Sequence, residues 1–184
     1  MKNPKVAVFS GSRYGRGAKK NKELAYKLGQ VMAGAKYAVI NGGGPGLMEE
    51  LSRGAHDHKG EVICVHLHME KREESKYATK IYKYTKITPR QQKIISLADA
   101  FIILPGGLGT VFESIEVFVK KYFQDIDREK PMIFLGKSFW RPLINLINNL
   151  VKEGFIEKHI KSQFKVVDNP AEAIKILNKY FRNN

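Results

Sequence analysis

Glycine-rich turns suited to holding a phosphate are the strongest chemical signal in this sequence. The clearest turn, Pro105–Thr110, reads Pro-Gly-Gly-Leu-Gly-Thr and stands between a short apolar run and an amphipathic one. Glycines let the backbone approach a ligand closely, and a helix that starts there offers free N–H groups and a positive dipole end. We therefore predict a phosphate site at this turn.

Two further turns of this kind, Ser10–Arg13 and Asn41–Met48, follow other apolar runs. One such turn is often only a tight connection, but three at the carboxyl ends of parallel strands favour a shared ligand site. None of them ends in Gly-Lys-Ser/Thr, and a spaced Gly-x-Gly-x-x-Gly is absent. These absences argue against a P-loop ATPase and a standard nicotinamide dehydrogenase.

The elements that must position these turns follow from the alternation of short apolar runs with longer amphipathic runs. Strands are expected at 6–10, 37–40, 61–66, 100–104 and 132–135, with a late edge strand at 164–167. Helices are expected at about 20–33, 47–57, 90–98, 111–123, 139–152 and 170–181. Such alternation predicts a Rossmann-like, doubly wound parallel sheet in a three-layer α/β/α fold, as a single domain over residues 1–184.

Composition and charge are those of a basic globular protein. The 184 residues are 43% hydrophobic and 27% charged, and no apolar run reaches the roughly 20 residues that span a bilayer. Cys64 is the only cysteine and lies in an apolar run, so we expect an inert thiol and a cytoplasmic location. The formal charge of +14 is spread along the chain, and its densest group, Arg16–Lys22, has only Tyr14 as a nearby aromatic. We interpret this surface as one that attracts anionic small molecules rather than nucleic acid or a membrane.

The stretch 69–87 is charged and then tyrosine-rich, which predicts a surface excursion that returns through a short strand. Glu70, Glu73 or Glu74 could contact the base or ribose of a ligand, although an exposed charged loop is the preferred interpretation. His66 and His68 alternate along a strand, but no third ligand accompanies them. No metal and no cofactor is therefore predicted.

The segment Pro105–Glu113 matches the signature Pro-Gly-Gly-x-Gly-Thr-x-x-Glu, and the sequence thereby resembles the Lonely Guy (LOG) family, long labelled "possible lysine decarboxylase". The resemblance covers nearly the whole chain. It includes Gly42–Met48, Ala98–Leu104, Lys130–Pro131 and Phe139–Trp140. It implies a Rossmann-like homodimer that hydrolyses the N-glycosidic bond of a nucleoside 5′-monophosphate, such as AMP or a cytokinin nucleotide, near the subunit interface. The products would be a free base and ribose 5-phosphate. No lysine is placed for a pyridoxal phosphate Schiff base, so decarboxylation finds no support.

The resemblance also assigns roles to residues. Glu113 would be the catalytic carboxylate that stabilises an oxocarbenium-like state or activates water, and Arg90, counted back from the shared Asp99, would orient the nucleotide. Substrate binding is expected from Gly11, Ser12, Gly43, Gly44, Gly46, Met48, Gly106, Gly107, Gly109 and Thr110.

Two features complicate these roles. Thr110-x-x-Glu113 is also a capping box, in which the glutamate caps a helix start; the family match makes us prefer the catalytic role. The family has a lysine where this chain has Gln91. Lys93 is three residues beyond Arg90 and is expected to share its helix face. The sequence alone does not show whether Lys93 replaces the family's lysine.

Two other functions are possible on the same fold. The first is a non-catalytic binder of a phosphate ligand, such as a molybdenum-cofactor carrier-like protein. The second is a nucleic-acid-binding relative of DNA-processing proteins, suggested by Gly11-Ser12-Arg13 and the charge of +14. Glu113 favours the hydrolase, because neither binder needs a carboxylate at that helix start.

Overall fold

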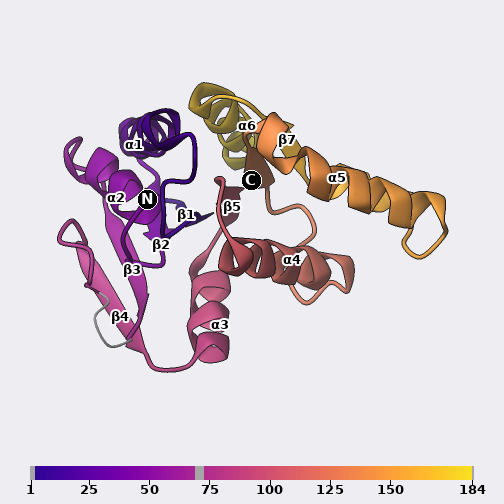
Figure 1. Cartoon of the computed structure of the whole chain (residues 1–184), viewed down its shortest axis with the longest axis horizontal. Coiled ribbons are helices and arrows are strands. Elements are labelled where there is room, and N and C mark those ends of the chain that lie inside the picture. The colour runs from indigo at the N-terminus through magenta and orange to yellow at the C-terminus, as the bar shows by residue number, and fades with distance from the viewer. Residues whose placement is uncertain (1–2, 69–72, 184) are drawn as a thin grey trace.

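Seven parallel strands form one sheet in the computed structural model, which describes residues 3–68 and 73–183 (Figure 1). The strands are β1 (Lys5–Phe9), β2 (Ala38–Asn41), β3 (Val62–Leu67), β4 (Lys80–Tyr84), β5 (Ala100–Ile103), β6 (Met132–Leu135) and β7 (Lys165–Val167). Their order is β4-β3-β2-β1-β5-β6-β7. The chain builds outward from β1 to β4 and then returns beside β1 with β5. The topological switch point, where ligands bind in such sheets, therefore lies between β1 and β5.

Helices cover both faces of this sheet, which confirms the predicted three-layer fold. One face carries α1 (Ala18–Gly34), α2 (Leu47–His56) and α6 (Pro170–Asn183). The other carries α3 (Ile87–Leu97), α4 (Leu108–Tyr122), α5 (Lys137–Lys152) and the 3₁₀ helix η1 (Lys158–Gln163). Residues of β1 alternate between the two cores, with Val6 and Val8 in one and Ala7 and Phe9 in the other. Helix α5 projects beyond the sheet at one end of the molecule (Figure 1).

The strands lie within about one residue of their predicted bounds, but α3 and α4 both start three residues earlier than predicted. Pro89 lies in the first turn of α3, where its missing N–H costs no helical hydrogen bond. Gly109 lies in the first turn of α4, whose N-cap is Gly107. The predicted helices started after these residues because glycine and proline usually interrupt a helix. The first turn of a helix tolerates both.

The predicted surface excursion does return through a short strand, β4, at the edge of the sheet. Before it, the backbone N–H of Ser75 donates to the carbonyl of Gly43 at 3.0 Å. Glu74 is ion-paired with Lys83 on β4 at 2.6 Å, and Glu73 is exposed. The base or ribose contact considered for Glu70 falls outside the described residues.

Two further findings concern the single cysteine and the length of the apolar helices. Cys64 is buried, and burial raises the pKa of its thiol to about 12, which keeps the thiol protonated at neutral pH. Within residues 3–68 and 73–183, no helix has the length and apolar character required to cross a membrane.

Candidate active site

The three glycine-rich turns meet at the carboxyl end of the sheet. The N–H of Gly11 donates to the carbonyl of Pro105 at 3.1 Å, and the N–H of Leu47 donates to the carbonyl of Gly11 at 2.9 Å. Gly46 has a φ of +74°, and a Cβ there would stand 2.3 Å from the carbonyl carbon of Ser12. The first turn is thus held between the other two, so the predicted convergence of the three turns is confirmed.

A cleft of about 600 Å³ opens at this junction, and we call it the first cleft. Its lining combines the start of α4 with α3 and the ends of several strands. The lining residues are Ser10, Ser12, Met48, Leu67, Ile87, Arg90, Gly107, Leu108, Gly109, Thr110, Phe112 and Glu113. Both predicted catalytic residues and five of the predicted binding residues are among them, so the structure brings them together.

Arg90 and Glu113 form an ion pair inside the first cleft. The Arg90 Nη1 donates to Oε1 of Glu113 at 2.6 Å, and the side chains are only 10% and 13% exposed. The Arg90 Nε also donates to the carbonyl of Val65 at 2.9 Å, which ties the guanidinium to the end of β3. Charged hydrogen bonds of this length in a largely desolvated site fix the position of both groups.

Gly42 makes the space that Arg90 occupies. A Cβ on Gly42 would lie 2.2 Å from Nη2 of Arg90 and 2.8 Å from the sulfur of Met48. Any larger residue would therefore displace the guanidinium or the thioether. The backbone of the second turn thus positions a residue from α3, 48 positions later in the chain.

The capping-box interpretation of Thr110-x-x-Glu113 is wrong. The N-cap of α4 is Gly107, no side chain caps the helix, and the first helical bond runs from the N–H of Val111 to the carbonyl of Gly107 at 3.0 Å. Thr110 therefore lies inside the first turn, and Glu113 lies too far along the helix to reach its start. Because the carboxylate is not used as a cap, it is available to Arg90.

The second turn is held by a buried asparagine that the sequence analysis did not single out. Oδ1 of Asn41 accepts from the N–H of Gly43 at 2.7 Å, and Nδ2 donates to the hydroxyl of Ser52 at 2.9 Å. Three of the predicted binding residues line neither the first cleft nor the second cleft, which is described below: Gly43, Gly44 and Gly46. Their direct contact with substrate stays a prediction.

Gln91 and Lys93 both lie outside the first cleft's lining. The Gln91 side chain is 1% exposed, and its amide atoms make no hydrogen bond within the described part of the chain. The Lys93 Nζ lies 4.7 Å from the centre of the Tyr82 ring, on β4. Lys93 therefore does not take the place of the family's lysine beside Arg90.

A second cleft, of about 480 Å³, adjoins the first. Its lining residues are Gly11, Ser12, Arg13, Tyr14, Gly15, Asn21, Leu47, Pro105, Gly106, Gly107 and Phe139. Ser12 and Gly107 line both clefts. The two predicted binding residues Gly11 and Gly106 belong to the second cleft alone.

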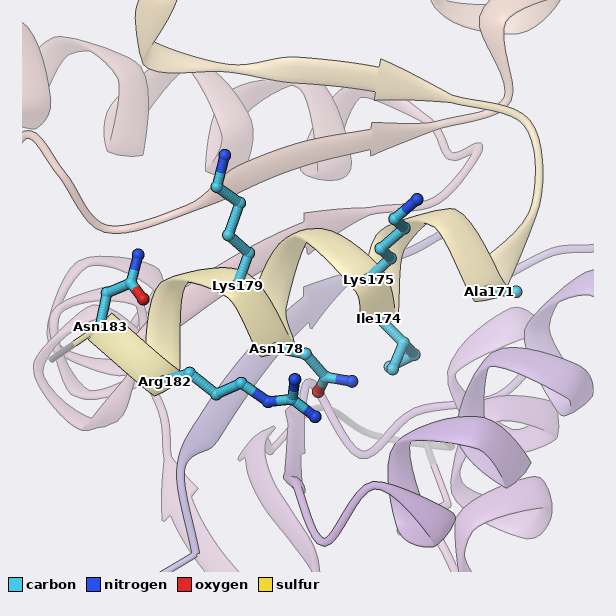
Figure 2. A pocket seen from close by; sticks show the side chains of 7 residues that line it. All are labelled: Ala171, Ile174, Lys175, Asn178, Lys179, Arg182 and Asn183. Carbon is cyan, nitrogen blue, oxygen red and sulfur yellow. The ribbon is translucent and has the colours of Figure 1, made fainter.

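A further hollow of about 560 Å³ follows α6 on the surface. Figure 2 shows that its lining side chains diverge, with Lys175 and Lys179 pointing to one side of the helix and Asn178 and Arg182 to the other. The Asn178 amide oxygen accepts from the Tyr37 hydroxyl at 2.5 Å. We therefore assign no ligand to this hollow.

No metal centre is found in the part of the chain that the structure describes, where no group of three or more His, Cys, Asp or Glu side chains is placed to hold an ion. The imidazole Nδ1 of His66 is 3.2 Å from the carbonyl of Gly43.

Sequence reasoning missed the apolar wall of the first cleft, formed by Leu67, Ile87, Leu108 and Phe112. Leu108 and Phe112 both stand inside the signature, and their place there was the available signal. Ile87 and Leu67 come together with them only through the fold.

Comparison with known proteins identifies the family of this chain. The family model described as "Possible lysine decarboxylase" matches residues 48–177. The chain is 32% identical to the cytokinin riboside 5′-monophosphate phosphoribohydrolase of Rhodococcoides fascians, covering 92% of this chain and 86% of that protein. It is 29% identical to the cytokinin riboside 5′-monophosphate phosphoribohydrolase LOG of Oryza sativa subsp. japonica, covering 96% and 73%.

The fold also resembles that of solved structures with lower sequence identity. The molybdenum cofactor binding protein of Rippkaea orientalis matches with a TM-score of 0.74 at 21% identity, covering 98% of this chain and 99% of that one. At these identities the likeness concerns the fold alone. The family model and the relative at 32% identity go further, and together they show that this chain belongs to the LOG family.

Proposed function

We propose that this protein hydrolyses the N-glycosidic bond of a nucleoside 5′-monophosphate, AMP or an N6-modified AMP, to a free base and ribose 5-phosphate. The observation that carries the proposal is the buried Arg90–Glu113 pair, which lines the same cleft as the start of α4. The relatives named as phosphoribohydrolases support the same class of reaction.

In the proposed complex the 5′-phosphate lies at the start of α4. The first N–H groups of a helix have no acceptor within the helix, and the helix dipole is positive there, so they bind phosphate well. Gly107 and Gly109 both line the first cleft, and a Cβ on either would meet no atom within 4 Å. The Ser10 and Ser12 side chains line the same region.

The ribose would then extend towards Glu113. When the glycosidic bond breaks, its electron pair goes to the base nitrogen and positive charge develops on the ribose ring. The Glu113 carboxylate stabilises this charge or accepts a proton from the attacking water, whose oxygen ends on C1′. Arg90 holds the carboxylate through the 2.6 Å bond. The departing base takes up a proton, so the hydroxyl group of the water ends on the ribose and the other hydrogen of the water is matched by the proton on the base.

The proposed active unit is a homodimer. Leu108, Phe112, Val119 and Phe123 leave an apolar strip exposed along α4, with exposed fractions between 45% and 89%. Exposed apolar surface of this kind marks interaction sites on folded proteins. Because Leu108 and Phe112 also line the first cleft, a partner seated on this strip would lie at the edge of the active site.

The test is to incubate the protein with AMP, GMP, CMP and N6-isopentenyl-AMP and to measure free base by chromatography. We expect base release from at least one adenine nucleotide, and a loss of roughly 100-fold or more in Glu113→Gln. Glu116→Gln is the matched control, because Glu116 lies on the same helix outside the first cleft and should keep its activity. Binding of nucleotide without base release would favour a carrier. Equal activity of Glu113→Gln and the unchanged protein would remove the carboxylate from the mechanism.

A further inference from the structure

We propose that the second cleft is a subsite for a second nucleoside, so that the protein binds two nucleosides joined by a 5′,5′-diphosphate. This inference rests on the proposed function in one respect: it places the first nucleoside and its phosphate in the first cleft.

The two clefts share part of their lining at the glycine turns. Ser12 and Gly107 line both of them, so a phosphate at these two residues has open space on either side. The volumes, about 480 Å³ and 600 Å³, both fall in the range of roughly 300–1,000 Å³ typical of small-molecule sites. Each is large enough for one nucleoside, and the proposal places the diphosphate link at the two shared residues.

Positive charge surrounds the second cleft. Arg13 lines it and is exposed, and the Lys22 Nζ lies 4.0 Å from the centre of the Tyr14 ring. The basic group Arg16–Lys22, part of the surface that we expected to attract anionic small molecules, therefore begins beside a ligand-sized space. Two carboxylates, Glu50 and Glu49, also act on Tyr14. The Glu50 Oε1 is 3.5 Å from the Tyr14 hydroxyl, and Glu50 is ion-paired with Arg53 at 2.6 Å. The net charge at the cleft suits a second phosphate.

Two aromatic side chains from separate parts of the chain offer stacking surfaces. Tyr14 follows β1, and Phe139, from α5, is 47% exposed while its ring lies against Trp140 at 4.9 Å between centroids. The Tyr14 segment is held in place, because Nδ2 of Asn21 donates to the Tyr14 carbonyl at 2.7 Å. A nucleobase stacks on such fixed aromatic rings, and nearby cations add to the attraction.

The experiment uses Glu113→Gln as the background, so that no ligand is cleaved during measurement. Calorimetry at low salt compares AMP with diadenosine 5′,5′-diphosphate. We expect the dinucleotide to bind on the order of tenfold more tightly, since it adds a charge contact and a stacked base. Adding Arg13→Ala or Phe139→Ala should remove most of this gain and leave AMP binding unchanged. Arg16→Ala is the matched control, because Arg16 is exposed and outside the lining, and it should keep the gain.

Three results would overturn the proposal: equal affinity for both ligands, an Arg13→Ala variant that weakens AMP as much as the dinucleotide, or tighter and steeply salt-dependent binding of a 5′-phosphorylated oligothymidylate. The last would identify the cleft as a nucleic-acid groove. Base release from AMP by the unchanged protein is measured separately. If the dinucleotide binds more tightly than AMP in an Arg13-dependent way but AMP is not cleaved, the subsite is supported and the hydrolase is rejected. If AMP is cleaved but the dinucleotide binds no more tightly, the hydrolase is supported and the subsite is rejected.

Discussion

At the scale of single residues, the Arg90–Glu113 pair differs from a surface ion pair of the same length. The Arg53–Glu50 pair is also 2.6 Å long, but its arginine side chain is 43% exposed, against 10% for Arg90. We expect Arg90→Met to lower the free energy of unfolding by about 3 kcal/mol, because Glu113 loses a cation that is itself buried and the carbonyl of Val65 loses its donor. Glu50 is as little exposed as Glu113, at 13%, but its partner Arg53 reaches solvent. Arg53→Met should cost less than about 1 kcal/mol. Urea denaturation of both variants checks this contrast, and similar losses in the two would contradict it.

Gly42 provides a second test at this scale. Gly42→Ala places a methyl group 2.2 Å from the present position of Arg90 Nη2, so the guanidinium has to move. Misplacing a catalytic-site group by about 1 Å costs on the order of 100-fold in rate, and we expect a loss of that size in kcat/KM. Gly34→Ala at the end of α1 is the control, since a Cβ there meets nothing within 4 Å. An active Gly42→Ala variant would show that the position of Arg90 is not critical.

Residue identities could be predicted from the sequence better than residue contacts. The signature pointed to Glu113 and the count back from Asp99 to Arg90, and the structure brings the two residues together across 23 positions. The local pattern also suggested a cap for Glu113, and only the early start of α4 excludes it. Asn41 escaped notice because a polar residue at a strand end carries no signal until its buried partners are known.

At the scale of elements, Lys121 links α4 to two other segments. Its Nζ donates to the carbonyls of Lys130 and Gln163 at 2.6 and 2.8 Å, and its side chain is 1% exposed. Burial lowers the pKa of Lys121 from 10.5 to about 8. Between these two pH values the unfolded chain holds one more proton than the folded one, so stability rises with pH.

We expect this rise to amount to roughly 3 kcal/mol between pH 8 and 10.5, with the full penalty present below pH 8. Urea denaturation of the unchanged protein and of Lys121→Met across this range measures it. Methionine cannot make the two hydrogen bonds of the Lys121 Nζ, and it does not titrate, so the stability of the Lys121→Met variant should lack the rise with pH. A constant difference between the two curves would mean that Lys121 titrates normally.

Elements themselves were largely predictable, for physical reasons. Strands buried on both faces are continuously apolar, and β6 (Met132–Leu135) matches its predicted bounds in full. Helix starts were less predictable, because glycine and proline destabilise the interior of a helix but are tolerated in its first turn. The position of the two clefts side by side could not be predicted, since it depends on three loops that meet only after the sheet forms.

At the scale of the whole molecule, the exposed strip on α4 determines the expected assembly. Val119→Glu combined with Phe123→Glu places charges on both sides of a two-fold interface, so we expect this variant to sediment as a monomer and the unchanged protein as a dimer. Ile81→Glu on the edge strand β4 is the control and should remain dimeric. A monomeric unchanged protein at all concentrations tested would contradict the proposed dimer.

The projection of α5 from the body has a practical consequence for labelling the protein. Helix α5 ends in a turn at Gly154, whose φ is +80° and where a Cβ would meet no atom within 4 Å, and Phe155 after it is 78% exposed. Every residue that lines the first cleft comes from positions 10 to 113. A reporter domain inserted between Gly154 and Phe155 would therefore be tethered to the rigid fold while the substrate-facing half of the chain kept its sequence intact.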